Sequence, residues 1–356
     1  MVPFAGWEMA VQFKGALEEH KAVRQRSGIF DISHMGVLRL NGPGAKDALQ
    51  GLVPTDLFRI GPGEACYTVL LNEQGGIQDD LIVYDRGWDP STQAHELFLV
   101  INAACAEADT TWIRSHLEPA GIRVSDHKGD GVLVALQGPE AAAQLETISG
   151  TRLDGLTRFG HRELEIAGIG SAFVARTGYT GEDGFELLLS QEAGVAFWAE
   201  CMKRMIQPCG LAARDILRLE AGMHLYGSDM DTTTTPLEAG LGWLVHLEMP
   251  KDFVGRKALE QQTNQGVAKR LVGLKLEGRA IPRRNYPVLR CTDTPTEKVG
   301  EITSGSWSPT LNYSIAFAYV SNELARPGTE LAVSIRERPE PAVVIKRPFF
   351  KHAALS

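Results

Sequence analysis

The 356-residue chain has few of the features that mark several large classes of protein. It has only 5 cysteines, which are scattered and form no C-x-x-C pair. This argues against a disulfide framework or a structural zinc site, and it predicts plain structural thiols in a reducing compartment. Its unbroken apolar stretches, such as residues 97–101, are far shorter than the roughly 20 residues of a membrane-spanning helix. Because the first residues also lack the pattern of a signal or transit peptide, the sequence predicts a soluble, cytoplasmic protein of bacterial type, although a processed organellar chain would look the same.

The charge balance and the missing motifs exclude further classes. A net charge of −8 is opposite to the basic footprint of general nucleic-acid binding, although a few local cations can still hold an anionic ligand. The chain has no H-E-x-x-H, no G-x-x-x-x-G-K-[ST], no G-x-S-x-G and no G-x-G-x-x-G that opens a helix. Among the 9 histidines, His34 is the most suggestive, and its ordinary interpretation is a histidine that fixes a turn by hydrogen bonds. We therefore expect neither metal catalysis nor triad hydrolysis.

The pattern of apolar residues divides the chain into two parts. The first part mixes helices and strands, whereas from about Lys269 short strands and turns predict a small β-barrel or sandwich. We place the boundary in the polar segment 260–269, which gives domains at residues 1–265 and 266–356. Helices are expected at residues 16–26, 103–116, 191–205 and 211–221. Strands are expected at residues 36–40, 67–71, 81–84, 97–101, 132–136, 170–175, 185–189, 271–276, 300–303, 315–320, 330–335 and 342–345, of which 97–101 reads as buried on both faces.

Two acidic residues follow a glycine pair and begin an apolar strand. Strand side chains alternate, so Asp80, Ile82 and Tyr84 share one face and can line a single pocket. Because adjacent carboxylates repel, one of Asp79 and Asp80 is expected to have a raised pKa that suits proton handling. The alternative is that either residue caps a turn after the glycines.

A glycine-rich loop at residues 176–184 leads into a second unusual strand. Its glycines permit close approach to a ligand. Glu186 follows among Phe185 and three leucines, and a buried carboxylate needs a partner with parallel N–H donors. An internal arginine would serve, and so would a pterin or guanine edge. The residues alone leave both open.

Two clusters of arginines complete the candidates. Arg214 and Arg218 are spaced i, i+4 on one helix face, where a solvated, ion-paired surface is the usual explanation. Arg279, Arg283 and Arg284 form a basic cluster on an otherwise acidic chain. This cluster is either a solvated turn or a docking site for an acidic carrier protein.

Together these segments resemble the aminomethyltransferase (T-protein) family of the glycine cleavage system over almost the whole chain. The resemblance rests on F-A-G-W-E-M at residues 4–9, F-D-I-S-H-M at 30–35, D-D-L-I-V-Y at 79–84, L-Q-G-P at 136–139, residues 176–186 and 214–227, D-F-V-G-R at 252–256, E-I-T-S-G at 301–305 and S-P-T at 308–310. It implies an α+β fold with folate-binding subdomains around a central channel, followed by a C-terminal β-barrel. The implied reaction passes the methylene carbon from the aminomethyl-dihydrolipoyl arm of H-protein to tetrahydrofolate, with release of ammonia and without a metal.

The resemblance also implies roles for individual residues. Asp80 matches the family's essential aspartate, and Glu186 matches its pterin anchor. Arg214 matches a folate-site arginine, which would contact either the pterin carbonyl or the glutamyl tail. The other positions that line the family's folate channel are Tyr84, Tyr179, Tyr67, Met35, Val100, Asn102 and Trp243.

Three other interpretations compete with this one. A folate-dependent demethylase module would be joined to a flavin domain, for which there is no dinucleotide fingerprint. A non-catalytic folate-binding paralogue would carry K-G-C-[FY]-x-G-Q-E, where this chain reads K-D-F-V-G-R at residues 251–256. A purely structural carrier-binding subunit would not need Glu186 in an apolar strand. The chain departs from the family in a shorter start before Phe4, which suggests a truncated N-terminus, and in Ala10 where proline is common.

Overall fold

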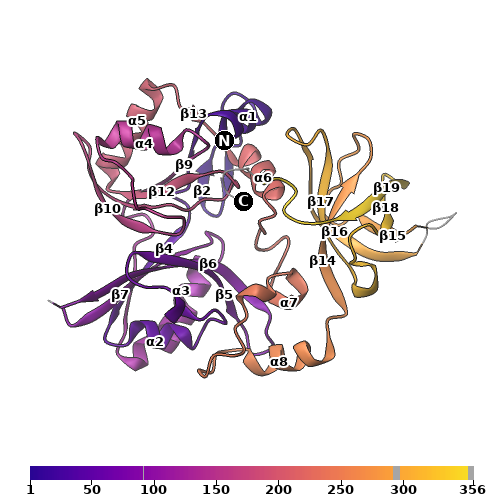
Figure 1. Ribbon diagram of the computed structural model, residues 1–356, viewed down its shortest axis with the longest axis horizontal. Coiled ribbons are helices and arrows are strands. Elements are labelled where there is room, and N and C mark those ends of the chain that lie inside the picture. The colour runs from indigo at the N-terminus through magenta and orange to yellow at the C-terminus, as the bar shows by residue number, and fades with distance from the viewer. Residues whose placement is uncertain (91, 292–296, 352–356) are drawn as a thin grey trace.

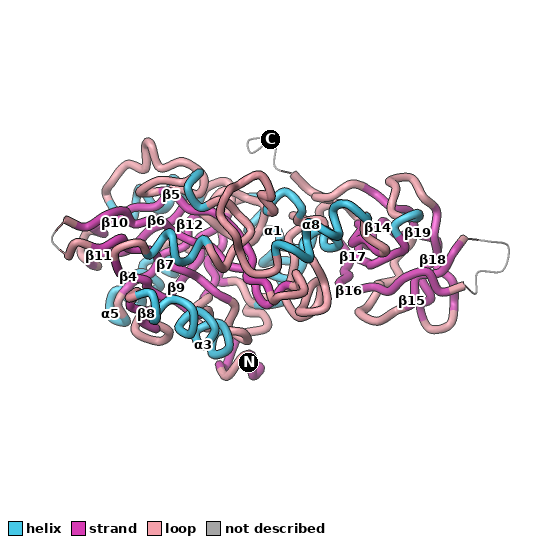
Figure 2. The backbone as a smooth tube through the Cα atoms, turned by 90° about the horizontal axis from the view of Figure 1, so that it is seen from below, coloured by secondary structure: helices cyan, strands magenta, loops and turns pink. Residues whose placement is uncertain are grey.

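The computed structural model describes residues 1–90, 92–291 and 297–351, which form three lobes around the middle of the molecule (Figure 1). Two lobes are each built on a β-sheet, and the third is a barrel that extends away from them, as the perpendicular view shows (Figure 2). No helix in these residues is both long enough and apolar enough to cross a membrane.

The first lobe is an antiparallel sheet covered on one face by helices. Its described strands follow the order β5-β6-β7-β4-β8: β4 (Gly36–Gly42), β5 (Glu64–Leu71), β6 (Ile77–Asp89), β7 (Ala94–Ile101) and β8 (Arg123–Asp126). Helices α2 (Ala45–Gln50) and α3 (Ala106–Leu117) pack on the outer face, where Leu81 and Val83 join the helices' leucines and isoleucines in one core. The strand alternation therefore points Asp80, Ile82 and Tyr84 of β6 toward the second lobe.

The second lobe repeats this plan with a sheet of order β10-β11-β12-β9-β3-β13. The strands are β3 (Gly28–Asp31), β9 (Val132–Gln137), β10 (His161–Ile166), β11 (Gly170–Ala175), β12 (Gly184–Leu189) and β13 (Gln207–Pro208). Helices α4 (Ala141–Ser149) and α5 (Gln191–Lys203) cover its outer face. The inner faces of the two sheets meet where Tyr84 packs against Phe173 and Ala175, so any site between the sheets has apolar walls.

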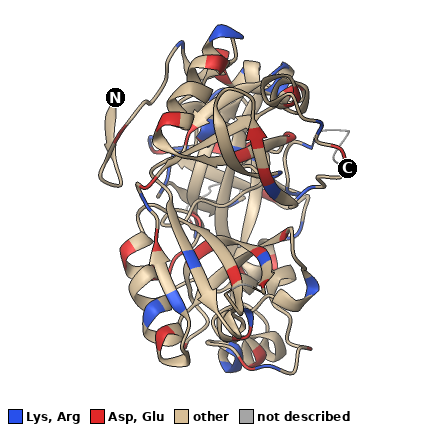
Figure 3. Ribbon diagram, turned by 90° about the vertical axis from the view of Figure 1, so that its left-hand side faces the viewer, with Lys and Arg blue, Asp and Glu red and all other residues tan. Residues whose placement is uncertain are grey.

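The two sheets are joined to the barrel by helical segments. Helices α1 (Ala16–Gln25) and α6 (Leu211–Glu220) pack on each other, and a segment with α7 (Pro236–Ala239), η3 (Gly242–Leu244) and α8 (Arg256–Gln265) runs along the first sheet to the barrel (Figure 1). The described barrel strands close in the order β14-β17-β16-β15-β18-β19: β14 (Lys269–Leu276), β15 (Pro287–Arg290), β16 (Lys298–Ser308), β17 (Tyr313–Ser321), β18 (Glu330–Ile335) and β19 (Arg338–Ile345). A separate hairpin of β1 (Val2–Phe4) and β2 (Trp7–Met9) lies at the start of the chain (Figure 3).

A buried polar network fastens α6 to the barrel. Glu220 is fully buried, and its carboxylate accepts hydrogen bonds from Arg24 at 2.7 Å and from the His20 ring at 2.9 Å. It also contacts the hydroxyl groups of Ser308, at 2.5 Å, and Thr310, at 3.2 Å, which belong to the barrel side. Burial favours the neutral acid, but these donors together lower the pKa of Glu220 to about 2.

The predicted α+β class and the C-terminal barrel are confirmed, and so are the predicted helices and strands, with shifted ends. One prediction about residues 97–101 is wrong. Leu97, Leu99 and Ile101 are buried, whereas Phe98 and Val100 are only half-buried because they point into the space between the sheets. Among the described elements, the strands that were not predicted are β1, β2, β3, β8, β10, β13 and β15, and the α-helices that were not predicted are α2, α4, α7 and α8.

Candidate active site

Asp80 lies at the centre of a hydrogen-bonded cluster on the inner face of the first sheet. Tyr67 of β5 donates its phenol hydrogen to Asp80 Oδ2 at 3.0 Å. Asn102, directly after β7, donates its side-chain amide to Asp80 Oδ1 at 2.8 Å and to Asp79 Oδ1 at 2.9 Å. The turn-cap alternative is therefore wrong for both acids, because each lies within β6 and is held by other strands.

The environment of Asp80 favours the protonated acid. Burial, together with the negative charge of Asp79, raises the pKa of Asp80 to about 7, although the hydrogen bonds from Tyr67 and Asn102 oppose the shift. A carboxyl group with this pKa can both take and return a proton near neutral pH.

Glu186 lies near Tyr84, on the inner face of the second sheet. Its Oε2 accepts a hydrogen bond from the Thr177 hydroxyl at 2.6 Å, and that hydroxyl lies 3.4 Å from the phenol oxygen of Tyr84. No cation in the described residues reaches ion-pair distance of Glu186, so of the two alternatives the internal salt bridge does not form there. Burial raises the pKa of Glu186, while Thr177 and the charge of Arg214 oppose that rise.

Arg214 and Arg218 share one helix but have different surroundings. Arg218 is 2% exposed and binds Asp229 at 2.6 Å and the Ser304 hydroxyl at 2.7 Å, so the predicted solvated face is wrong for this residue. Arg214 has no carboxylate at ion-pair distance within the described residues, and its guanidinium lies 4.7 Å from the ring centre of Tyr179. Burial lowers the pKa of Arg214, which is partly offset by Tyr179 and Glu186. A half-buried, unpaired guanidinium beside an aromatic ring is suited to an anionic or carbonyl-bearing ligand.

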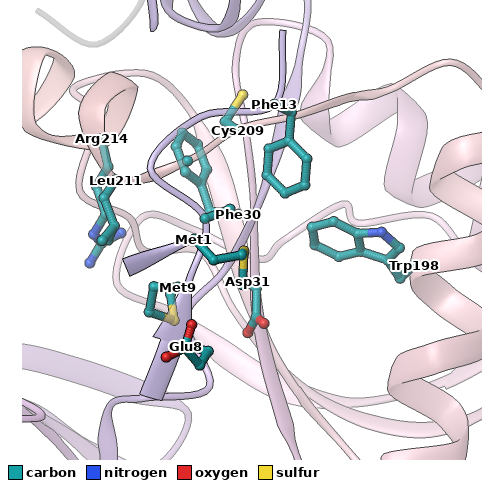
Figure 4. Close-up of a pocket in the computed structure, with 12 residues that line it drawn as sticks. Met1, Glu8, Met9, Phe13, Phe30, Asp31, Trp198, Cys209, Leu211 and Arg214 are labelled. Carbon is teal, nitrogen blue, oxygen red and sulfur yellow. The ribbon is translucent and has the colours of Figure 1, made fainter. Parts of the chain in front are cut away.

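Two cavities adjoin these groups. A cavity of about 180 Å³ lies between the N-terminal hairpin and α6, with Arg214, Glu8 and Asp31 among apolar neighbours (Figure 4). A second, of about 10 Å³, is lined by Tyr84, Val100 and Glu186 with apolar residues of both sheets. Asp80 lines neither of these two cavities, so the sharing of one pocket by Asp80 and Tyr84 stays a prediction.

The remaining residues predicted to line the channel differ in their contacts. Tyr67 stacks on Trp243, with ring centres 6.2 Å apart, and Trp243 is 65% exposed. Val100 lies opposite Ile82 in the sheet, and Met35 packs beside it. Tyr179 donates its phenol hydrogen to the His224 carbonyl, which anchors the glycine-rich loop.

Two interpretations from the sequence require correction. The backbone of the glycine-rich loop at Gly178 packs closely against the Gln137 side chain and not against an open ligand space. A Cβ atom at Gly178 would lie 2.0 Å from Gln137 Oε1, so only glycine fits there. His34 does not fix a turn through Nδ1, which has no hydrogen-bond partner in the described residues, and its ring instead packs edge-on against Phe4. Burial and the positive charge of Arg214 lower the pKa of His34 to about 4.

The arginine cluster at residues 279–284 is exposed on the barrel side. Arg279, Arg283 and Arg284 have no acidic partner at ion-pair distance in the described part of the chain. Arg284 donates a hydrogen bond to the Ser228 hydroxyl at 3.3 Å, which joins the cluster to the loop that carries Asp229.

Two sheets that face each other with buried carboxyl groups on their inner sides are an arrangement typical of enzymes that bind a ligand. The family model described as the GCVT N-terminal domain matches residues 1–249, and the model described as the glycine cleavage T-protein C-terminal barrel domain matches residues 269–351. The chain belongs to the glycine cleavage T-protein (aminomethyltransferase) family.

Individual relatives agree with this assignment. The chain is 62% identical to an aminomethyltransferase of Prochlorococcus marinus (strain MIT 9303), over 100% of this chain and 95% of that protein. It is 63% identical to an aminomethyltransferase of Synechococcus sp. (strain RCC307), over 99% and 95%. The crystal structure of the glycine cleavage system aminomethyltransferase T from Bartonella henselae superposes with a TM-score of 0.89 at 34% identity, covering 98% of this chain and 94% of that one.

Proposed function

We propose that this protein transfers a methylene carbon from the aminomethyl-dihydrolipoyl arm of an H-protein to tetrahydrofolate. The carbon's bonds to nitrogen and sulfur break, which yields ammonia and the free dihydrolipoyl thiol. Tetrahydrofolate, as the acceptor substrate, supplies the nitrogens N5 and N10, and their two protons leave as the two new bonds form. The product is 5,10-methylenetetrahydrofolate, and the protons are accounted for in the ammonia and the thiol.

The observation that carries this proposal is the held carboxyl group of Asp80. Tyr67 and Asn102 fix its two oxygens, and the pKa of about 7 suits it to accept the N10 proton and pass it on. Its negative form also stabilises positive charge that develops on the transferred carbon. In this scheme Asp80 is the catalytic residue.

Glu186, Tyr84 and Arg214 are suited to hold the pterin ring. The Glu186 carboxylate lacks a cationic partner in the described residues, and its oxygens match the parallel N–H donors of a pterin edge. Four residues along a strand span about 13 Å, so a ligand that reaches from Tyr84 to Asp80 must be elongated and extend beyond the 10 Å³ cavity. Folate has that shape, and the exposed Trp243 beside Tyr67 would border its outer end.

The carrier protein would dock at the exposed cluster of Arg279, Arg283 and Arg284. These cations have no acidic partner among the described residues, which leaves them free for an acidic surface.

All 5 cysteines are free thiols, which is consistent with a reducing compartment such as the bacterial cytoplasm.

The function is tested by measuring ammonia release from aminomethylated H-protein with and without tetrahydrofolate. We expect strong acceleration by tetrahydrofolate, and a rate that does not respond to it would refute the transferase assignment.

Docking is tested separately by reversing charges on the barrel. Arg283→Glu combined with Arg284→Glu should slow association with H-protein and flatten its salt dependence. Arg338→Glu, another exposed arginine on the barrel, is the matched control. An association rate that the double reversal leaves unchanged would remove the docking proposal and leave the reaction untouched.

A further inference from the structure

A third carboxyl group, that of Asp109, lies behind the Asp79–Asp80 pair. Asp109 is on α3, four residues after Cys105, so the two side chains share one helix face. Ligand atoms of Asp79, Cys105 and Asp109 all lie within 4.8 Å of one another, and Asp109 is only 3% exposed. The mechanism described above uses neither Asp109 nor Cys105.

This arrangement requires a proton between the acids. No Lys, Arg or His in the described residues forms an ion pair with Asp79, Asp80 or Asp109, and two adjacent buried carboxylates repel strongly. Asp79 accepts from Asn102 N at 2.9 Å, from Asn102 Nδ2 at 2.9 Å and from Cys105. Asp109, in contrast, has one oxygen, Oδ2, without a partner in the described residues, and its hydrogen bond is to Asp79. The donors therefore surround Asp79, and the proton belongs on Asp109.

We propose, on the basis of the function proposed above, that Asp109 is a positioning residue that acts as a neutral acid. Its hydroxyl hydrogen holds Asp79, Asp79 fixes the amide of Asn102, and that amide holds Asp80 Oδ1. Asp109 touches no reacting atom in this scheme. Burial and the neighbouring charge of Asp79 raise the pKa of Asp109 to about 10, in agreement with the neutral form.

Asn102 is the physical link between the two sides of the sheet. Asp79 points toward α3 and Asp80 toward the second lobe, because neighbouring strand residues face opposite ways. The Asn102 side chain contacts both carboxylates at the end of β7. A rotation of its amide would therefore break the bond to Asp80, even though Asp109 lies on the opposite face.

The first experiment compares Asp109→Asn with Asp109→Leu in the full-length protein by steady-state ammonia release. Asparagine keeps a donor for Asp79, so kcat should stay within about threefold of wild type, whereas leucine removes one hydrogen bond and should lower kcat roughly tenfold or more. Glu107→Gln, an exposed position on the same helix, is the control. Equal losses in both variants would overturn the proposal, because they would show that the negative charge matters.

The pH profile separates positioning from a purely structural role. The ionisable groups that face Asp80 and its cluster are Asp79 on β6, Tyr67 on β5, Tyr179 in the glycine-rich loop, Cys105 and Asp109 at α3, and Tyr226 in the segment after α6. Asp79→Asn removes a charge beside Asp80 and should move the acidic limb of kcat to lower pH, whereas Asp109→Asn should leave that limb in place. A downward shift in Asp109→Asn would mean that Asp109 is ionised, which refutes the proposal.

A measurement without turnover keeps this inference distinct from the proposed function. In protein with ¹³C-labelled aspartate carboxyls, the signal lost in Asp109→Asn should remain in its protonated position from pH 6 to about pH 9. A signal in the ionised position at neutral pH would overturn the proposal even in an active enzyme. If ammonia release by the wild-type protein does not respond to tetrahydrofolate, the proposed function is refuted. The protonation state of Asp109 can still be measured by NMR in that case.

Discussion

The sharpest prediction concerns the charge of Glu186. Replacing Glu186 with glutamine keeps the size of the side chain and one acceptor oxygen, but it removes the charge opposite the proposed pterin donors. Hydrogen bonds to a charged group contribute about 1.5–3 kcal/mol each. The loss of one such bond therefore predicts a Kd for tetrahydrofolate that rises about 10- to 150-fold, at about 1.4 kcal/mol per tenfold.

The neighbouring hydroxyl group gives a graded comparison. Thr177 donates to Glu186 Oε2 at 2.6 Å and does not carry charge, so Thr177→Val should weaken binding less, by roughly twofold to tenfold. Glu165→Gln makes the same exchange at an exposed position on β10 and should leave the affinity unchanged. The loss of affinity for tetrahydrofolate is expected to be largest in Glu186→Gln, smaller in Thr177→Val and absent in Glu165→Gln.

Isothermal titration calorimetry with tetrahydrofolate under anaerobic conditions measures all three variants. An affinity of Glu186→Gln within about twofold of wild type would refute the anchoring role, since it would show that the glutamate binds as a neutral acid or not at all. Denaturant unfolding of each variant checks that the sheet is intact.

Three further outcomes are expected. Asp80→Asn should bind tetrahydrofolate within a few-fold of wild type but release ammonia about 100-fold more slowly or worse, and normal turnover would show that Asp80 has no catalytic role. In the wild-type protein kcat should fall as the pH drops below about 7, because the Asp80 carboxylate becomes protonated there, and a flat profile through that range would contradict the assigned role. Glu220→Gln should lower the free energy of unfolding in urea by about 1.5–3 kcal/mol, because Arg24 would lose one of its two buried carboxylate partners and keep only Glu182. The pKa of Glu220 is depressed to about 2 in the folded protein, from about 4.3 in the unfolded chain. The stabilisation by the Glu220 carboxylate is therefore complete above about pH 4.3 and is lost as the pH falls toward 2. A difference in unfolding free energy between wild type and Glu220→Gln that does not shrink between about pH 4.3 and about pH 2 would contradict this prediction.

The sequence carried enough information for the architecture because burial follows the strand period. The alternation in residues 79–84 is enough to place Asp80 and Tyr84 on one face, and closely spaced short strands predict the barrel. Strand β10 also alternates, since Glu163 and Glu165 are exposed while Leu164 and Ile166 are buried, so its sequence carries the same signal. Strands β3 and β15 have four residues each, too few for a periodic pattern to stand out.

The partners within the site could not be predicted in the same way. That Glu186 pairs with Thr177, and not with an arginine, depends on the turn of the glycine-rich loop. Phe98 and Val100 read as buried because local hydrophobicity does not show that a second sheet stands opposite with a space between. The spacing of Cys105 and Asp109 on one helix face was a usable signal for the third acid, but only the pairing of β6 with β7 brings Asp79 and Asn102 to it.

Helix α6 connects the cavity that Arg214 lines with the barrel. Its early turns carry Arg214 to the cavity, while Leu219 packs on Leu271 and Phe317 of the barrel. A fragment that ends before the barrel would expose Leu219 to solvent. In that fragment Glu220 would also lose the hydrogen bonds from Ser308 and Thr310. The two regions matched by separate family models are therefore expected to unfold cooperatively, and removal of the barrel is expected to disturb Arg214, which lies on the same helix as Leu219 and Glu220.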